Sequence, residues 1–415
     1  MKKIAVSLLA LLATNAYAGG YRIAMQGQRQ LGMGHTGVSI FNQNAEALFF
    51  NPASGVFMKN KWSFSGGVNY LKSDVIFQNK DYNWSRETTN VGTPFYFYGN
   101  YQATDKFSVG LAVYTPYGSS VAWDKDWEGS HLVNNIKLQA IYVQPTVSYK
   151  LTKDVSLGAG LIYVNGGVNF NRNLSRNMVD ENGNRSNVTL DASGVSAWGY
   201  NVGLAAKLDK YVNMGINYRS QIDMKAENGT TTFENLPAFA QANFKNGYFN
   251  ATMPLPAELS IGFSYQVSDK VLAAVEYNHA FWNAYDALRI EFVDSPIGTS
   301  VNQRNYKNSS IFRAGLQYQA TDNFSARIGG YYDQSPIKTG YFAPETPRND
   351  AFAGTLGFTY QINDRLSVDV SAMSVFFKEI NESYNHYIED RNPVSFGGTY
   401  RSAAVTAGIG VSYNF

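Results

Sequence analysis

The sequence VTAGIGVSYNF, residues 405–415, alternates an apolar side chain with a small or polar one and ends on phenylalanine. Successive side chains of a β-strand point to opposite faces, so the six apolar residues of this stretch would share one face. A strand that closes a barrel in a bilayer needs such a face toward lipid, with aromatic side chains at the interface. A half-buried strand of a soluble β-sandwich is the alternative that this stretch leaves open.

Residues 1–18 have the three parts of a secretory signal peptide. Lys2 and Lys3 supply the charged start, residues 4–13 a short apolar stretch, and Ala16-Tyr17-Ala18 a cleavage site with small residues. The apolar stretch is shorter than the roughly 20 residues of a membrane-spanning helix, and no later segment approaches that length. We therefore expect export, cleavage after Ala18 and a mature chain that begins at Gly19.

Composition limits the classes of function. The chain of 415 residues has no cysteine, which excludes disulfides, metal–thiolate sites and cysteine nucleophiles. It has 34 Lys and Arg against 32 Asp and Glu, and cleavage of the signal peptide would remove two lysines and balance the charge. A balanced chain gives no electrostatic basis for binding nucleic acid. The 37 Gly, 29 Tyr and 26 Phe suit a membrane β-barrel, although a secreted β-sandwich would have a similar composition.

Six short polar turns recur along the chain, each between two strand-like runs, as in tight hairpins. They are Thr104-Asp105-Lys106, Thr152-Lys153-Asp154, Asp209-Lys210, Ser268-Asp269-Lys270, Thr321-Asp322-Asn323 and Asn363-Asp364-Arg365. Longer polar stretches, rich in Asn and Gly, alternate with these turns. We expect loops near residues 72–93, 118–134, 171–195, 226–254, 283–305, 335–350 and 378–400.

The turns predict the strand count. Six hairpins join twelve strands, one strand near 61–72 must precede them, and one near 404–415 must follow. The result is an all-β fold, a transmembrane antiparallel β-barrel of 14 strands over residues 61–415, with counts of twelve and sixteen left open. Both ends of the barrel lie on the side of the short turns, which in outer-membrane barrels faces the periplasm.

Residues 19–60 do not fit the strand pattern. They contain the Gly-rich turn Gly32-Met33-Gly34-His35-Thr36-Gly37 and a possible short helix near 44–48. A periplasmic tail and a plug inside the lumen are both compatible with this position before the first strand. The apolar run Ala47-Leu48-Phe49-Phe50 favours the plug, or hatch, because a solvated tail would be more polar.

Several motifs in this order resemble the FadL family of outer-membrane transporters for long-chain fatty acids and other hydrophobic molecules. They run over nearly the whole mature chain and are Gly19-Gly20-Tyr21, Leu31-Gly32-x-Gly34, Phe50-Asn51-Pro52-Ala53, Tyr117-Gly118, Trp198-Gly199, Tyr218-Arg219-Ser220, Asp333-x-Ser335-Pro336 and Tyr413-Asn414-Phe415. The resemblance implies a 14-stranded barrel with a luminal hatch, in agreement with the turn count. It also implies capture of the ligand in an outer-loop groove, passage to a site beside the hatch, and lateral release through the wall.

The resemblance places the ligand path along the hatch and a kinked strand. Tyr21, Asn51, Pro52 and Ala53 match the family's hatch positions, although Tyr21 could equally have a plain packing role. The kink is expected at Pro116-Tyr117-Gly118, because proline cannot donate a ladder hydrogen bond and glycine tolerates a bend. Alternatively, Pro116 simply ends its strand. By analogy with the family, Asn51 or Asp333 would cover the backbone groups that the kink leaves unpaired.

Polar and apolar ends of the ligand need different partners. Arg172 matches a family arginine near the inner site and could grip a carboxylate with two parallel donors, with surface binding to lipopolysaccharide phosphate as the alternative. The family's second cation has no match: Asn302 stands there and Arg304 follows two residues later. Asp333 completes the set of expected head-group or gating residues. For the capture groove we expect a helical stripe from the loop 233–249, or a loop packed on the barrel rim. The groove residues expected are Leu236, Phe239, Phe244 and Tyr248.

The histidines offer no enzyme site. His35, His131, His279 and His386 include no pair at metal-ligand spacing and none near a plausible serine nucleophile. We therefore expect no enzyme activity, no metal and no cofactor.

We interpret the chain as a monomeric outer-membrane protein of a Gram-negative bacterium that takes up hydrophobic molecules passively, long-chain fatty acids first. Its expected partners are this ligand, the lipid and lipopolysaccharide around the barrel, and the barrel-assembly machinery, which would recognise Phe415. The alternatives are a general diffusion porin, an adhesin barrel, and a channel of the same family for aromatic hydrocarbons.

Overall fold

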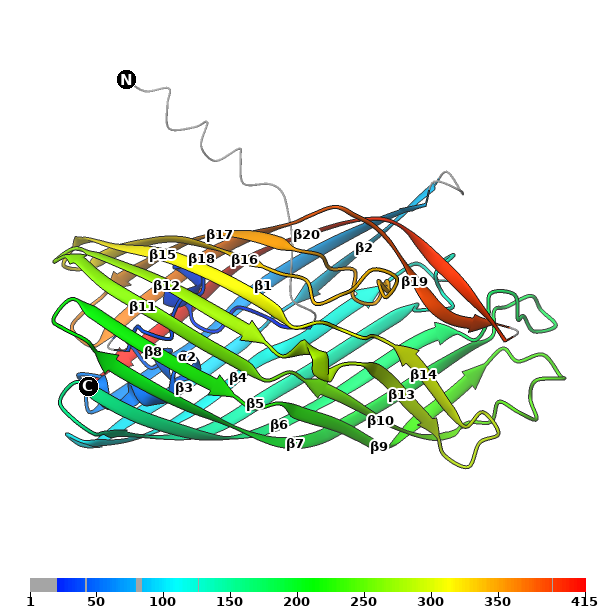
Figure 1. Cartoon of the computed structure of the whole chain (residues 1–415), viewed down its shortest axis with the longest axis horizontal. Helices are drawn as coiled ribbons and strands as arrows, with labels where there is room; N and C mark the ends of the chain where they lie inside the picture. Colours follow the sequence, from blue (N-terminus) through cyan, green and yellow to red (C-terminus); the bar gives the residue numbers. More distant parts are fainter. Residues whose placement is uncertain (1–20, 42, 80–83, 126, 390) are drawn as a thin grey trace, which may run out of the picture.

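The computed structural model describes residues 21–41, 43–79, 84–125, 127–389 and 391–415. These residues form a closed antiparallel β-barrel (Figure 1), in which β1 (Trp62–Asn79) pairs with β20 (Asn392–Asn414) and so joins the ends of the sheet. Following the ladder pairings around the described wall gives 14 strands, as the sequence predicts. The soluble sandwich is therefore excluded. Among the described residues no helix is both long and apolar enough to cross a bilayer.

Six of the 14 strands are interrupted and appear as two collinear segments each. The interrupted strands are β2 (Trp84–Gly92) with β3 (Phe95–Thr104), β8 (Val212–Arg219) with β9 (Ile222–Glu234), β10 (Gly247–Leu255) with β11 (Glu258–Ser268), β12 (Val271–Ala280) with β13 (Ala287–Phe292), β14 (Thr299–Gln303) with β15 (Ser309–Thr321), and β18 (Leu366–Phe377) with β19 (Ile380–Glu389). The remaining strands are β1, β4 (Phe107–Ala122), β5 (Asn135–Lys150), β6 (Val155–Asn173), β7 (Asn187–Lys207), β16 (Phe324–Asp333), β17 (Ala351–Gln361) and β20.

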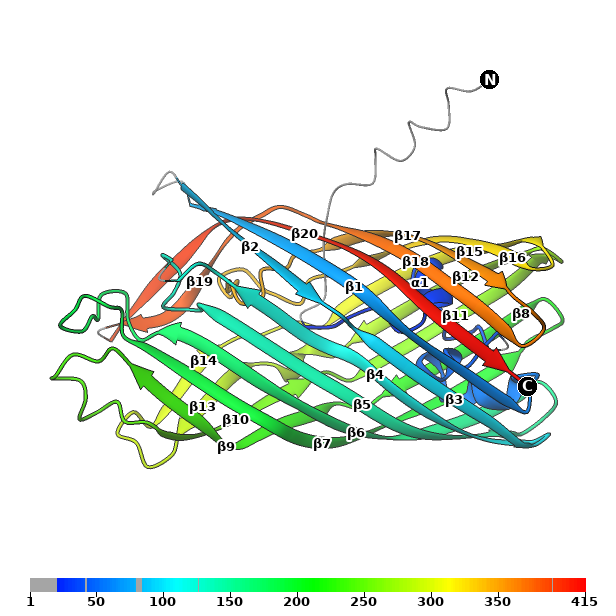
Figure 2. The same cartoon turned by 180° about the vertical axis from the view of Figure 1, so that it is seen from behind.

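The C-terminal stretch alternates in burial as its sequence predicts. Ile409, Val411 and Tyr413 are exposed on the outside of β20, whereas Thr406 and Ser412 are buried inside. All six predicted turns connect paired strands, and Figure 2 shows the C-terminus at the end of the barrel where these turns lie. The apolar outer face and the polar inner face are the pattern that a barrel in lipid requires.

The strands run further than the sequence analysis predicts. Residues 72–79, 84–92, 380–389 and 392–400 are expected in loops, but they lie in β1, β2, β19 and β20. The prediction is wrong for β2 because its sequence, WSRETTNVG, is polar on both faces. A strand in water on both sides has no apolar alternation to reveal it. In β19 the buried Tyr384 and Tyr387 lie on either side of a bulge, which breaks the period of two.

The N-terminal segment, residues 21–58, lies inside the barrel in the half near the short turns (Figures 1 and 2). It contains α1 (Gln28–Gly32), α2 (Ala47–Phe50) and the 3₁₀ helix η1 (Pro52–Phe57), and none of its described residues is exposed. The predicted signal peptide, residues 1–18, lies outside the described residues.

Buried ion pairs and backbone hydrogen bonds fix this segment to the wall. The guanidinium of Arg29 donates to Asp369 on β18 at 2.9 Å, and Arg22 lies 3.2 Å from Glu258 on β11. Glu276 on β12 accepts hydrogen bonds from the backbone N–H groups of Gly37 and Val38 at 2.8 and 3.0 Å. Arg22, Arg29 and Glu276 therefore each have a partner, as burial in a low-dielectric interior requires.

Glycines on the inner face of the wall make room for the segment. A Cβ atom added to Gly215 on β8 would lie 1.9 Å from the carbonyl oxygen of Val38, and one added to Gly315 on β15 would lie 2.2 Å from that of Met33. Backbone therefore packs directly on backbone at these positions, which only glycine allows.

Candidate functional site

Strand β4 is kinked at Thr115 and Pro116. Its pairing with β5 shifts between Tyr114, opposite Tyr142, and Tyr117, opposite Ala140, so two residues of β4 face one of β5. Such a bulge bends its strand. The alternative that Pro116 ends the strand is wrong, since β4 continues to Ala122.

At the kink, β4 also loses its ladder pairing with the neighbouring wall strand opposite to β5. Strand β3 pairs with β4 only as far as Tyr96 opposite Tyr114, and β2 above it has no ladder pairing with β4 among the described residues. Beyond Tyr114, β4 therefore has a backbone ladder only with β5 among the described residues, and Thr88 on β2 reaches it through a side-chain hydrogen bond to Ala122 O.

The N-terminal segment covers the free backbone of β4. Ile23 N donates to Pro116 O at 2.8 Å, Gly118 N donates to Tyr21 O at 2.9 Å, and the side-chain amide of Gln26 donates to Thr115 O at 3.0 Å. The expectation that Asn51 or Asp333 covers these backbone groups is wrong.

Asn51 and Asp333 lie elsewhere. The amide of Asn51 donates to Val38 O at 3.0 Å and to Leu204 O of β7 at 2.9 Å, and its oxygen caps η1 through Ala53 N. Asp333 is the buried last residue of β16, between Ile311 and Ala351 in the ladder. Neither side chain, nor Pro52 or Ala53, lines the cavity described next.

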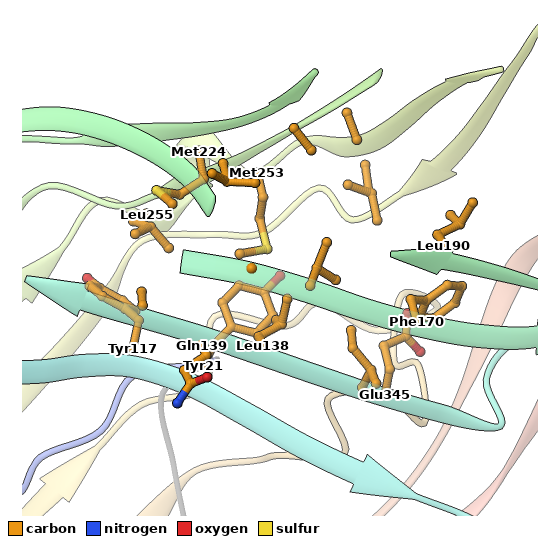
Figure 3. A pocket seen from close by; sticks show the side chains of 18 of the residues that line it. Tyr21, Tyr117, Leu138, Gln139, Phe170, Leu190, Met224, Met253, Leu255 and Glu345 are labelled. Atoms are coloured by element: carbon orange, nitrogen blue, oxygen red, sulfur yellow. The ribbon is translucent and has the colours of Figure 1, made fainter. Parts of the chain in front are cut away.

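An apolar cavity lies above the N-terminal segment (Figure 3). The space amounts to about 1020 Å³, including the part open to solvent, and most of its lining is aliphatic, aromatic or methionine side chain. It ends at Tyr21, Tyr117 and Gly118, beside the kink, so the kink residues predicted from the sequence lie on its wall. The lining further includes Leu138, Phe170, Leu190, Met224, Phe249, Met253, Leu255, Leu288 and Ile290.

A buried ion pair forms the polar border of the cavity. The guanidinium of Arg304 donates to the carboxylate of Glu345, and both residues line the cavity. A guanidinium keeps its proton in proteins, and the buried carboxylate of Glu345 supplies the opposite charge beside it. Arg304 therefore stays charged, and Glu345 neutralises it.

Arg172 lies in an adjoining pocket that shares Phe170, Arg304 and Glu345 with the apolar cavity. Its guanidinium donates to the backbone oxygen of His131 at 3.0 Å and has no carboxylate within ion-pair distance in the described part of the chain. Arg172, Arg304 and Glu345 together carry one net positive charge.

His131 covers this pocket from the loop between β4 and β5. It is fully buried, and its ring packs on Tyr387 and Phe396 at centroid distances of 4.7 and 5.3 Å. Burial, with the positive charges of Arg172 and Arg176, lowers its pKa to about 4. His131 is therefore neutral near pH 7.

The loop expected to form the capture groove is made of turns. The expected helical stripe is absent, because residues 237–243 form no helix. Hydrogen bonds from Ala240 N to Pro237 O and from Phe244 N to Ala240 O close turns there instead. Leu236 and Phe244 pack on an apolar cluster that contains Phe249 and Ile290 of the cavity lining. The rings of Phe239 and Tyr248 are exposed by 77% and 55%.

Sequence reasoning missed several lining residues. Met224, Met253 and Leu255 face the cavity from β9 and β10, and Glu345 reaches it from the loop after β16 (Figure 3). Met224 alternates with Asp223 and Lys225, a strand signal that lies just before the stretch 226–254 expected as a loop.

Comparison with protein families identifies one match. The model of the family described as outer membrane protein transport protein (OMPP1/FadL/TodX) matches residues 9–415. Outer membrane protein P1 of Haemophilus influenzae is 24% identical, with 100% of both chains covered. The long-chain fatty acid transport protein of Escherichia coli (strain K12) is also 24% identical, over 95% of this chain and 96% of that protein.

Solved structures share the fold. A FadL homologue of Pseudomonas aeruginosa superposes with a TM-score of 0.83 at 20% identity, covering 96% of this chain and all of that one. The toluene transporter TbuX of Ralstonia pickettii gives a TM-score of 0.69 at 19% identity, covering 94% and 98%. These likenesses establish the barrel architecture.

Proposed function

Because the chain belongs to the outer membrane protein transport family (OMPP1/FadL/TodX), we propose that it takes up long-chain fatty acids through the apolar cavity. It is a transport protein of the Gram-negative outer membrane, not an enzyme, and its cargo is hydrophobic. Relatives carry names for both fatty acid and toluene transport, so the length and polarity of the cavity must decide between them.

The observation that carries the proposal is an elongated apolar cavity with a cationic border. A long acyl chain gains about 0.8 kcal/mol for each CH₂ that leaves water, so a continuous apolar lining favours it strongly. The lining runs from Phe249 and Ile290, next to the outer loop cluster, to Gly118 at the kink. An acyl chain in this space would have its carboxylate near Arg172, where one positive charge is uncompensated.

Two roles follow for the ends of the path. Leu236 and Phe244, with the exposed ring of Phe239, would receive the ligand outside, and Tyr248 would extend that apolar surface. The N-terminal segment would act as the hatch that stops passage straight through the lumen. Release would occur sideways at the kink, after residues 21–26 leave the backbone of β4.

The direct test is uptake of radiolabelled oleate by cells that lack their own transporter and produce this protein. We expect saturable uptake that depends on the protein. Uptake of toluene without uptake of oleate would contradict the fatty acid proposal and favour an aromatic hydrocarbon as cargo. A general porin is disfavoured because the described residues of the N-terminal segment lie inside the barrel and none of them is exposed.

Replacement of Arg172 by alanine should weaken oleate binding selectively. A hydrogen bond to a charged group contributes about 1.5–3 kcal/mol, so we expect the Kd for oleate to rise roughly tenfold to a hundredfold. The Kd for oleyl alcohol should stay within about a factor of two, because it has no carboxylate. Titration of the purified protein with both ligands measures this, and equal losses for both would contradict the role.

Deletion of Phe415 should reduce assembly. We propose that the barrel-assembly machinery recognises this terminal ring, which is half exposed and pairs through its backbone with Trp62 at 2.8 and 3.0 Å. We expect less heat-modifiable, folded protein in outer-membrane fractions and unchanged synthesis. A Phe415→Tyr protein, which keeps the aromatic ring, is the matched control and should assemble normally. The same barrel is proposed to act as a monomer surrounded by lipid and lipopolysaccharide.

A further inference from the structure

The barrel wall has a second break in its strand pairing, between the wall strand formed by β10 and β11 and the one formed by β12 and β13. Strands β10 and β13 pair only from Phe249 to Ala251, and β11 and β12 pair again from Glu258, opposite Ala280. Residues 252–257 and 281–289 lie between these points, and we call them the second seam. One backbone hydrogen bond crosses it among the described residues, from Phe281 N to Ala257 O at 2.9 Å. Figure 1 shows the chain leaving the sheet here as a curl between β12 and β13.

Aromatic side chains close the second seam from inside. The 3₁₀ helix η2 (Trp282–Ala284) turns Trp282 and Tyr285 inward, and both are almost fully buried. Their rings pack edge-on against Tyr21 at centroid distances of 5.7 and 5.9 Å. Residue Tyr21 also binds Gly118 at the kink, so one residue of the N-terminal segment contacts both breaks in the wall.

A groove on the outer face meets the cavity at the second seam. The groove, about 860 Å³ including its open part, is lined by Thr252 and Pro254 on one side and Ala284, Asp286 and Ala287 on the other. Ala251 lines both the groove and the apolar cavity. Met253 and Leu255 of the same strand point into the cavity (Figure 3). At the second seam the groove and the apolar cavity are therefore separated by side chains and not by paired strands.

The second seam begins just above the aromatic band of the outer wall. Tyr218 is the ladder partner of Leu259 and lies 6.2 Å from the ring of Tyr200, which is half exposed. On the other flank, Tyr277 lies 5.2 Å from Phe312. Exposed aromatic rings mark the membrane interface in such barrels. The groove is therefore at the level of the lipid head groups of the outer leaflet.

We propose that the second seam is a lateral port through which an uncharged single-chain lipid, such as a fatty alcohol, passes from the outer leaflet into the apolar cavity. Its chain would enter between Met253 and Tyr285, and its hydroxyl would stay in the polar groove. This port rests on the proposed function, since it supplies the same cavity by a second route.

The charges of the groove determine which lipid enters. Asp223, Asp286 and Glu291 face it with Arg289 as the one cation among its described lining residues, and that arginine already pairs with Asp286 at 3.1 Å. The net negative charge repels a carboxylate and offers acceptors to a hydroxyl donor. Fatty acids would thus enter by the outer loops and neutral lipids by the port.

A photo-labelling experiment tests the port. The full-length mature protein is reconstituted into liposomes whose membrane contains a C18 alcohol with a diazirine at the chain end, and labelling of Met253 and Leu255 is followed by mass spectrometry. We expect rapid labelling in the wild type. Ala284→Trp and Thr252→Trp, which fill the groove from its two sides, should each lose the rapid phase but reach wild-type labelling after long incubation.

A matched control separates the possible outcomes. Ala273→Trp adds the same bulk to the lower, lipid-facing part of β12 and should keep the rapid phase. Unchanged rapid labelling in both groove variants would overturn the port. Equal rates for the C18 alcohol and the corresponding C18 acid would overturn the charge selection. Absence of labelling in the wild type would overturn the proposed cavity function, and the port with it.

Discussion

Cells that produce the Gly118→Arg protein are expected to lose nearly all uptake of oleate. Gly118 lies on the wall of the apolar cavity at the kink, and a Cβ atom there would lie 3.1 Å from Cδ1 of Ile23. An arginine side chain would extend from this point into the passage and place a charge among apolar groups, which is costly without a partner. We expect uptake to fall at least about tenfold, equivalent to roughly 1.4 kcal/mol or more in the barrier.

The matched control is Gly118→Ala. Its single methyl group would lie 3.1 Å from the flexible end of Ile23, which can move by a few tenths of an ångström, and 3.4 Å from Leu138 O, an ordinary contact. This variant should transport oleate at close to the wild-type rate. Both variants must show the heat-dependent gel shift of a folded barrel. Wild-type uptake by a folded Gly118→Arg protein would refute lateral release at the kink while leaving the cavity in place.

Gly215→Val is expected to displace the N-terminal segment and open the lumen. A Cβ atom at residue 215 would overlap the carbonyl oxygen of Val38 at 1.9 Å, and backbone cannot yield as a side-chain end can. The segment must move, and it would lose the hydrogen bonds of Gly37 and Val38 to Glu276. A buried carboxylate that loses donors destabilises the packed state by about 1–3 kcal/mol or more. We expect a severalfold rise in ion conductance of the purified protein in planar bilayers.

Gly354→Val is the control for added bulk in a strand. Gly354 lies on the outer face of β17, and a Cβ atom there would have no heavy atom within 4 Å. Its conductance should match the wild type. A folded Gly215→Val barrel with wild-type conductance would contradict the role of residues 21–58 as a hatch.

Local sequence predicted the barrel well where one side of the wall faces lipid. The alternation of Ile409, Val411 and Tyr413 with small residues gave the lipid face, and the six polar turns gave 14 strands. The same reasoning failed for β2, where both faces are polar, and for β19, where a bulge between the buried Tyr384 and Tyr387 breaks the period of two.

The candidate site, too, was predictable only where local sequence decides the structure. Proline and glycine at 116 and 118 predicted a kink because their backbone chemistry is local. The resemblance to the family pointed to Arg172, and Arg304 lies two residues after the position of the family's second cation. The ion-pair partner of Arg304 could not be predicted from the sequence. Glu345 is 41 residues away in sequence and approaches only because the loop after β16 folds over the lumen.

The sequence alone thus predicted export from its N-terminal residues, determined that the chain closes into a barrel in lipid, and indicated a segment too apolar to remain in water. These properties depend on composition and on a period of two, which are readable within a single strand. Only the tertiary structure decided what covers the kink, where the cavity ends and where the wall opens a second time. Those features join Tyr21 to Gly118 and to Trp282, residues brought together by closure of the barrel around the N-terminal segment. Contacts between distant parts of a chain leave no pattern in any one stretch of it.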